Sequence, residues 1–423
     1  MKKNIFPALG LFLSLSCFAQ TTDKISQLQT LAQAYITAHN NTDTLLYNQW
    51  LDQANWEQAL KLRKLQGFKN GARGVGALET VKINPISDSS VQILAKDRQF
   101  DGWWKIMVYT NTNTQFKDRT LQPHRFSTEL MQQGLLSTET IQKQIDNYLA
   151  TKLQPFSGEI LITKNNVPVY KKKIGQTNLY GLASLSKLFA AVAILQLRDE
   201  GKLALDDSLA KHLPFIKNAA IRSITIRQLL THSSGLGDFF QHPEYEQLKA
   251  SLKTDADFLP LLESDQVRFA PGSKWQYSNN GFAWLGVLVS TLSHQNYEDY
   301  LVQHIFRPAG MNETSVQNGS GGGKSTVQDL NNFSQALRNS TLLNKSSTKE
   351  LLTYTFNEEY GLGSEHAQIG TEHIIGHSGG YIKVCTELNI YTISGYNVII
   401  LSDVDPPFAH FLSNKIKELL IRN

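Results

Sequence analysis

The feature that most constrains the fold is an apolar run at residues 187–197, Lys-Leu-Phe-Ala-Ala-Val-Ala-Ile-Leu-Gln-Leu, which contains neither Gly nor Pro. Arg198 and then Gly201 follow this run. A cation in the last turns and a glycine just beyond them are typical of a helix that ends there. Because the run is almost wholly apolar, the sequence predicts a long, largely buried helix.

Ser184 opens this run in a Ser-x-x-Lys string with Lys187. Helical residues i and i+3 share a face, with Cβ atoms about 5–6 Å apart, so Lys187 can reach the Ser184 hydroxyl. The positive end of the helix and the apolar surroundings both disfavour a charged Lys, which predicts a lowered pKa and an amine that can take a hydroxyl proton. The same helix start offers the Ser184 backbone N–H to a developing oxyanion.

The Ser-x-x-Lys string also occurs at residues 208–211 and 346–349, where it opens polar stretches. Serine is a good helix N-cap, and that role accounts for both of these matches. Only the Ser184 string stands before a buried helix, so context rather than the string itself singles it out.

A second string, Tyr277-Ser278-Asn279, lies between Pro271-Gly272 and a helix predicted over 282–292. A tyrosine on such a loop is more often a packed ring than a catalyst. Near a lysine ammonium, however, a phenolate is stabilised, which predicts a lowered pKa for Tyr277 and a role as general base.

The third string, His377-Ser378-Gly379-Gly380, precedes an alternating strand predicted over 381–386. Paired glycines allow a substrate backbone or carbonyl to approach closely. The alternative is a simple turn between two strands. Cys385 falls in the predicted strand and is expected to be a small buried apolar side chain.

These three strings in this order, with Leu-Leu-Thr-His-Ser-Ser-Gly-Leu at 229–236 and Phe-Arg-Pro-Ala-Gly-Met at 306–311, resemble the serine β-lactamase and penicillin-binding superfamily. The branch that is most similar comprises class C β-lactamases, DD-peptidases and their esterase relatives. The resemblance covers roughly residues 150–423. It implies an α+β domain in which both ends build an antiparallel sheet, flanked by helices, with a helical insert between them.

The resemblance also implies a role for each motif residue. Ser184 would be the acylated nucleophile, and Lys187 and Tyr277 would share the proton transfers. Asn279 would bind the substrate amide or position Lys187. The remaining substrate-binding residues would be His377, Ser378, Gly379 and Gly380, and the oxyanion hole would combine the backbone N–H groups of Ser184 and Gly380.

One departure from the family pattern bears on the substrate. His377 stands where true β-lactamases have a Lys, and a mostly neutral His is a weaker partner for a substrate carboxylate. This favours a peptidase, amidase or esterase over an efficient β-lactamase. Its substrate would be a small molecule or a peptide, with cell-wall-derived peptides among the candidates. A class C-type β-lactamase and a catalytically silent peptidoglycan- or peptide-binding protein are the alternatives.

Composition excludes several other classes of function. The 423 residues carry a net charge of +4 that is dispersed along the chain, which argues against a nucleic-acid partner. The 11 His residues show no paired ligand spacing, so neither a metal nor another cofactor is expected.

The first 19 residues are predicted to be a signal peptide, with Lys2-Lys3, an apolar stretch over 5–15, and Ala19 for cleavage. The protein is therefore expected to be exported, to the periplasm or outside the cell. A lipoprotein anchored to the membrane through Cys17 is the less favoured alternative.

Residues 21–125 are predicted to form a separate small α+β domain, loosely similar to the NTF2-like group. Strands are expected over 91–95 and 104–108, with a turn at Asp101-Gly102, and helix over 51–65. The aromatic residues Phe100, Trp103 and Trp104 are expected in the core rather than in a ligand site. A helical linker at 126–150 then leads into the serine hydrolase domain, 151–423.

Overall fold

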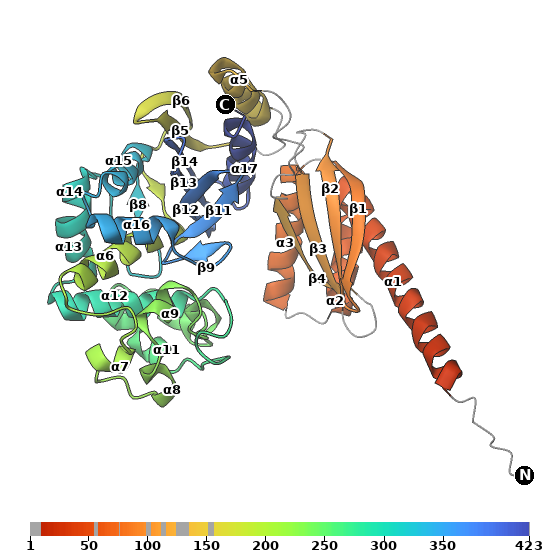
Figure 1. The fold of residues 1–423 in the computed structure, drawn as a ribbon, viewed down its shortest axis with the longest axis horizontal. Coiled ribbons are helices and arrows are strands. Elements are labelled where there is room, and N and C mark those ends of the chain that lie inside the picture. Colours follow the sequence, from red (N-terminus) through yellow and green to blue (C-terminus); the bar gives the residue numbers. More distant parts are fainter. Residues whose placement is uncertain are drawn as a thin grey trace, which may run out of the picture. The chain divides into compact units, whose positions relative to one another are not determined.

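The computed structural model describes residues 10–54, 58–75, 77–98, 103–110, 116–123, 135–150 and 156–422 (Figure 1). It divides into two compact units, Met1–Pro155 with Asn414–Asn423, and Phe156–Ser413. Both units combine helices with antiparallel sheets, so the α+β class expected from the sequence is confirmed.

The first unit holds a four-stranded antiparallel sheet in the order β1-β2-β3-β4. The predicted pairing of its two central strands is confirmed, with Val91 opposite Val108 and Ala95 opposite Trp104, all four of them buried. The strands are β1 (Leu78–Ser87), β2 (Ser90–Asp97), β3 (Trp103–Thr110) and β4 (Phe116–Pro123), and the helices are α1 (Gly10–Asn41), α2 (Thr44–Gln53), α3 (Gln58–Val75) and α5 (Thr138–Ala150).

Several expectations for this unit are modified by the structure. The helix predicted over 51–65 is two helices, α2 and α3. The predicted turn at Asp101-Gly102 and Phe100 lie outside the described residues, whereas Trp104 is buried as expected. Of the predicted linker, residues 135–150 are described, and α5 accounts for residues 138–150. In the part of the chain that the structure describes, no helix combines the length and the apolarity needed to cross a bilayer.

The second unit is built on an eight-stranded antiparallel sheet in the order β6-β5-β14-β13-β12-β11-β10-β9. Strand β5 lies next to β14, so the two ends of this unit meet in the sheet, as predicted. Its strands are β5 (Gly158–Lys164), β6 (Val167–Ile174), β9 (Thr355–Asn357), β10 (Tyr360–Gly361), β11 (Glu365–Ile369), β12 (Glu372–Tyr381), β13 (Val384–Tyr391) and β14 (Tyr396–Ser402), and a separate pair comprises β7 (Tyr180–Gly181) and β8 (Lys324–Ser325).

The helices of this unit surround α6 (Lys187–Asp199) and α12 (Asn279–Ser293), both largely buried. Helix α6 is the predicted buried helix, and it ends before Gly201, which has a φ of 74°. Short 3₁₀ turns η1 (Ala183–Ser186), η2 (Phe239–Gln241) and η3 (Asp255–Phe258) and a π-turn η4 (Val302–Phe306) link the helices. The remaining helices are α7 (Leu209–His212), α8 (Ala219–Arg222), α9 (Ile226–Leu230), α10 (Tyr245–Leu248), α11 (Leu259–Glu263), α13 (Tyr297–Leu301), α14 (Arg307–Ala309), α15 (Val327–Arg338) and α16 (Lys345–Thr353). Helix α17 (Phe408–Leu420) begins in this unit, and its residues from Asn414 on are assigned to the first unit.

The strand expected over 381–386 is wrong. The paired glycines lie inside β12, and a two-residue turn at Ile382-Lys383 leads into β13. The register pairs Tyr381 with Val384 and Gly380 with Cys385, which is fully buried as expected. The left-handed φ of 54° at Lys383 closes this tight hairpin, and no Gly or Asn marks the turn in the sequence.

Candidate active site

Ser184 lies in the 3₁₀ turn η1, immediately before α6, and not in the α-helix itself. Residues i and i+3 eclipse each other in a 3₁₀ turn, so the predicted contact with Lys187 is kept. The Lys187 Nζ and Ser184 Oγ atoms are 3.2 Å apart. Ser184 is half-buried and therefore not sealed from solvent.

Lys187 is fully buried at the first turn of α6. Its Nζ contacts the Asn279 Oδ1 atom at 2.8 Å and the Ser320 carbonyl oxygen. Burial lowers the pKa of Lys187 to about 7, against the opposing effect of the carboxylates of Asp238 and Glu365. The lowered pKa predicted from the sequence is confirmed, and burial is its cause.

These three contacts fit a neutral amine. A neutral lysine has two N–H bonds and one lone pair. The Asn279 and Ser320 oxygens can only accept hydrogen bonds, so they take both N–H groups. The lone pair is then left for the third neighbour, the Ser184 hydroxyl. The arrangement therefore orients Lys187 to accept the Ser184 proton.

Tyr277 packs beside the same amine, with Lys187 Nζ 5.0 Å from its ring centroid. Its hydroxyl is buried and makes no hydrogen bond of ordinary distance and angle to the described residues. Burial raises the pKa of Tyr277, and the nearby Ser184 hydroxyl only partly offsets the rise. The lowered pKa expected for Tyr277 is therefore wrong, because desolvation outweighs the adjacent amine, and Tyr277 stays a neutral phenol.

Asn279 occupies the N-terminus of α12 and uses both ends of its amide. Its Oδ1 accepts from Lys187, and its Nδ2 donates to Asp238 Oδ2 at 3.0 Å. Of the two roles foreseen for Asn279, the described contacts support the positioning of Lys187. Asp238, which sequence reasoning missed, fixes the orientation of this amide.

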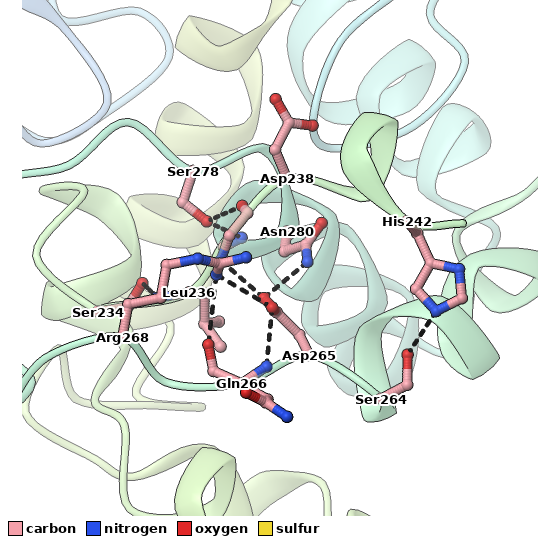
Figure 2. Close-up of polar contacts among 12 residues, drawn as sticks. Ser234, Leu236, Asp238, His242, Ser264, Asp265, Gln266, Arg268, Ser278 and Asn280 are labelled. Atoms are coloured by element: carbon pink, nitrogen blue, oxygen red, sulfur yellow. Dashed lines mark hydrogen bonds and ion pairs between the residues drawn. The ribbon is translucent and has the colours of Figure 1, made fainter. Parts of the chain in front are cut away.

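The loop that carries Asp238 is held to α12 by Asp265, as Figure 2 shows. Asp265 Oδ2 accepts from the Gly237 N–H and from Asn280 Nδ2, each at 2.7 Å. The Ser278 hydroxyl also donates to the Gly237 carbonyl at 2.8 Å (Figure 2). Buried Asp265 thus sets the position of residues 237–238 relative to 278–280.

His232 holds Tyr277 in place by contacting that ring and the backbone on both sides of it. Its backbone carbonyl accepts from the Gln276 N–H at 2.9 Å, and its Nδ1 accepts from the Ser278 N–H at 3.1 Å. Its ring lies 4.2 Å from that of Tyr277, centroid to centroid. His232 is fully buried with a left-handed φ of 55°, and burial holds its pKa well below the usual range. The sequence placed it only within a family motif.

His377 is buried on β12 with both ring nitrogens engaged. Its Nδ1 lies 2.6 Å from the Ser378 carbonyl oxygen, which can only accept, so Nδ1 carries the proton. Its Nε2 therefore accepts from the Tyr360 hydroxyl at 3.0 Å. Burial lowers the pKa of His377, against the opposing effect of Glu365. A direct contact with substrate stays a prediction, since the described contacts give His377 protein partners on both nitrogens.

Among the residues that the structure describes, the stretch 377–381 of β12 has a sheet neighbour on one side only. Its pairing with β11 stops at Gly376, whereas its pairing with β13 continues to Tyr381. On one face of the sheet, a Cβ built at Gly379 would lie 2.1 Å from the Leu182 carbonyl oxygen, just before the Ser184 turn. Only glycine permits this approach. Gly380 is exposed, and its oxyanion role with the Ser184 N–H stays a prediction.

Among the described residues, no group of three or more His, Cys, Asp or Glu side chains is arranged to hold a metal ion. An alcohol, an amine, a phenol and backbone amides together supply the groups that acyl transfer needs. The structure brings together four of the predicted residues, Ser184, Lys187, Tyr277 and Asn279, and their catalytic roles stay predictions. The supporting groups on Asp238, Ser320 and Glu365 were not predicted from the sequence.

A family model described as Beta-lactamase matches residues 145–415. The chain belongs to the beta-lactamase family. It is a serine hydrolase of that family, related in sequence to penicillin-binding proteins. The chain is 35% identical over 150 residues to penicillin-binding protein 4* of Bacillus subtilis, which is 35% of this chain and 33% of that protein.

Two solved structures illustrate the shared fold of this beta-lactamase-family chain. A penicillin-binding protein from Bacillus halodurans is 26% identical with a TM-score of 0.57, over 67% of this chain and 100% of that one. A D-amino acid amidase from Ochrobactrum anthropi is 20% identical with a TM-score of 0.54, over 67% of this chain and 98% of that one. The first curated relatives are matched over only 33% and 39% of their own length.

Proposed function

We propose that this beta-lactamase-family hydrolase forms an acyl-enzyme on Ser184 and cleaves an amide or ester bond, as a peptidase, amidase or esterase rather than as an efficient β-lactamase. One observation carries the proposal: Lys187 Nζ has two oxygen acceptors and, at 3.2 Å, the Ser184 hydroxyl. That arrangement activates an alcohol at neutral pH.

In the first step, Ser184 Oγ bonds to the carbonyl carbon while its proton moves to the Lys187 lone pair. The carbonyl oxygen becomes an oxyanion, which the backbone N–H groups of Ser184 and Gly380 are proposed to stabilise. The tetrahedral intermediate then expels the leaving group. That group takes a proton from Tyr277, and Tyr277 is reprotonated by the Lys187 ammonium, which leaves Lys187 neutral again.

In the second step, water releases the acyl group. Neutral Lys187 accepts one water proton as the oxygen bonds to the acyl carbon, and Ser184 Oγ departs with a proton that Lys187 returns. A neutral Tyr277, with its raised pKa, suits this relay because it gives a proton only as it receives one.

Two observations support an amide or ester of a small molecule or peptide as the substrate. His377 is buried and its pKa is lowered, so it offers no permanent cation to a β-lactam carboxylate. The open side of 377–381 can pair with an extended backbone in the manner of an added strand. The names of the matched relatives, a D-amino acid amidase and penicillin-binding proteins, agree with peptide-like substrates that include cell-wall fragments.

We further propose that the protein is exported, on the evidence of the predicted signal peptide at residues 1–19. Its substrate would then be met in the periplasm or outside the cell. Fusion of residues 1–24 to a reporter active only after export tests this proposal, and a cytoplasmic reporter contradicts it.

Covalent labelling tests the catalytic proposal. The purified protein is incubated with a fluorophosphonate, and the mass of the labelled peptide is measured for wild type and Ser184→Ala. Loss of the label in Ser184→Ala supports the acyl-enzyme, whereas no labelling supports the catalytically silent binding protein. Turnover of an aryl ester, a D-Ala-D-Ala peptide and nitrocefin then separates the activities, and nitrocefin as the best substrate would favour a class C-type β-lactamase.

A further inference from the structure

We propose that Glu365 selects the charge of the substrate: an amide or ester whose acyl part carries a protonated amine, and no carboxylate, close to the bond that is cleaved. This inference rests on the proposed function, since it concerns the substrate of the same Ser184 site.

A hydrogen bond between Ser378, a predicted substrate-binding residue, and Glu365 joins two neighbouring strands. The Ser378 hydroxyl on β12 donates to Glu365 Oε1 on β11 at 2.6 Å. The same oxygen lies 3.6 Å from His377 Nδ1, and the Glu365 side chain is 40% exposed. No hydrogen bond to Glu365 Oε2 is found in the described part of the chain. Glu365 is therefore held by one oxygen and presents the other to solvent.

The position of this carboxylate matters because Ser378 belongs to the open-sided stretch 377–381 of β12. A substrate carboxylate bound there would need a hydrogen-bond donor. Ser378 has a single O–H, and Glu365 already accepts it. An anionic substrate would therefore find the donor occupied and a like charge beside it. A protonated amine would find a free acceptor, Oε2, of opposite charge.

The other charged groups of the site reinforce this preference. Asp238 is a second carboxylate, and together with Glu365 it acts on both Lys187 and Tyr277. Both Asp238 oxygens are already engaged, by Asn279 Nδ2 and by the Phe240 N–H, each at 3.0 Å. Each Asp238 oxygen thus already accepts one hydrogen bond, whereas Glu365 Oε2 accepts none from the described residues, which makes Glu365 the carboxylate better placed to contact a substrate.

The two groups that could balance these charges are shifted towards neutrality. Burial lowers the pKa of Lys187 to about 7 and also lowers that of His377. In the catalytically active state, with Lys187 neutral, the site carries two carboxylates and no cation among these groups. A field of one sign attracts ligands of the opposite charge and rejects ligands of the same charge.

Three 4-nitroanilides of equal chain length test the inference: β-alanyl, butyryl and succinyl, which end in an ammonium, a methyl and a carboxylate. We expect kcat/KM to fall in that order, with about 100-fold between the first and the last. Glu365→Gln should lower the ratio of the β-alanyl to the succinyl value by about tenfold or more. Gln retains an oxygen that can accept from Ser378, and thermal unfolding of the variant verifies its fold.

Glu298→Gln is the matched control, because Glu298 is exposed on α13 and is not among the groups that act on Lys187 or Tyr277. It should leave the ratio unchanged. A wild-type preference for the succinyl substrate, or an unaltered ratio in Glu365→Gln, would overturn the inference.

The neutral members of the test separate this inference from the proposed function. Fluorophosphonate labelling of Ser184, or turnover of the butyryl anilide, supports the hydrolase whatever the charge preference. Where turnover is slow, the three anilides are compared as competitors of that labelling, and the same order is expected. Absence of both labelling and turnover contradicts the proposed function and this inference together.

Discussion

Lys187 Nζ and Asn279 Oδ1 lie 2.8 Å apart, although 92 positions in the sequence separate the two residues. The contact joins the start of α6 to the start of α12 and directs one N–H of the amine away from Ser184. A second N–H points to the Ser320 carbonyl. The direction of the remaining lone pair is therefore set by two distant parts of the chain.

Replacing Lys187 with Ala should lower kcat by about 10² or more, because Ser184 loses its proton acceptor. Steady-state turnover of an aryl ester measures the effect. Lys211→Ala is the control, since Lys211 belongs to another Ser-x-x-Lys string, is 59% exposed and pairs with Asp207. Near-wild-type turnover in Lys187→Ala would remove this amine from the mechanism.

The dependence of activity on pH should report the lowered pKa of Lys187. The neutral amine is the active form, so kcat/KM should rise with pH through a midpoint near 7, where burial places this pKa. A profile measured from pH 5.5 to 9 on a substrate without ionisable groups suffices. A rate that stays constant between pH 6 and 8 would contradict the assignment.

The stability of the fold should change with pH for the same reason. Between about pH 7 and 10, the unfolded chain holds a proton on Lys187 that the folded protein has lost, so the free energy of unfolding should rise with pH over this range. Lys187→Met, which cannot ionise, should flatten that rise and stabilise the fold below pH 7. The free energy of unfolding in urea is measured for both proteins at pH 6 and 9. An equal change between the two pH values in wild type and Lys187→Met would contradict the prediction.

Replacing Tyr277 with Phe should lower kcat by about 10² without moving the midpoint of the pH profile. The raised pKa of Tyr277 keeps it protonated over this range, so it relays a proton but does not titrate. The far-UV spectrum and the melting temperature should match those of the wild type. A midpoint that disappears in Tyr277→Phe would mean that the phenol is the titrating base.

Two substitutions at His232 should differ in their effect on catalysis. Asn tolerates the left-handed φ of 55°, and its amide oxygen can replace Nδ1 as acceptor for the Ser278 N–H. Leu provides neither property. We expect His232→Asn to retain at least about tenfold more activity than His232→Leu, because Tyr277 keeps its backbone anchor. Equal rates in two folded variants would show that this anchor is dispensable.

The Asp265 network should contribute more to stability than an exposed ion pair. Its carboxylate accepts from four groups, so Asp265→Asn places an amide N–H against another donor and should cost about 1–3 kcal/mol. The comparison is Asp206→Asn, which weakens an exposed pair with Arg227 and should cost under about 1 kcal/mol. Denaturant unfolding measures both, and equal losses would contradict the prediction.

Local rules made the central part of the site predictable. The i, i+3 spacing of Ser184 and Lys187 places them together in an α-helix and in the 3₁₀ turn that is observed, so the error in helix start did not matter. The turn at Asn165-Asn166 between β5 and β6 is equally local, since both residues have a positive φ, which Asn tolerates. The resemblance to the family then supplied Tyr277 and Asn279, which lie far away in the sequence.

Features that depend on the assembled fold could not be predicted. Glu365 and Asp238 act on Lys187 only because separate loops and strands converge in the fold. No motif or residue spacing in the sequence indicates that they do. The direction of the pKa shift of Tyr277 depends on how deeply the hydroxyl is buried, and the sequence does not reveal that burial. The hairpin at Ile382-Lys383 lacks the usual turn residues, so the limits of β12 were missed.

The pairing of β5 with β14 has a consequence for biosynthesis. Ile160 on β5 lies opposite Ile400 on β14. Strand β5 is the first strand of this unit to be synthesised, and it cannot complete its pairing until β14 has left the ribosome. The turn η1 with Ser184, the whole helical insert and strand β12 are synthesised between β5 and β14. A polypeptide that terminates before residue 396 would leave β5 with β6 alone and its inner edge bare. Nascent and prematurely terminated products that lack β14 should therefore be inert and prone to aggregate, and activity should appear only after β14 has been synthesised.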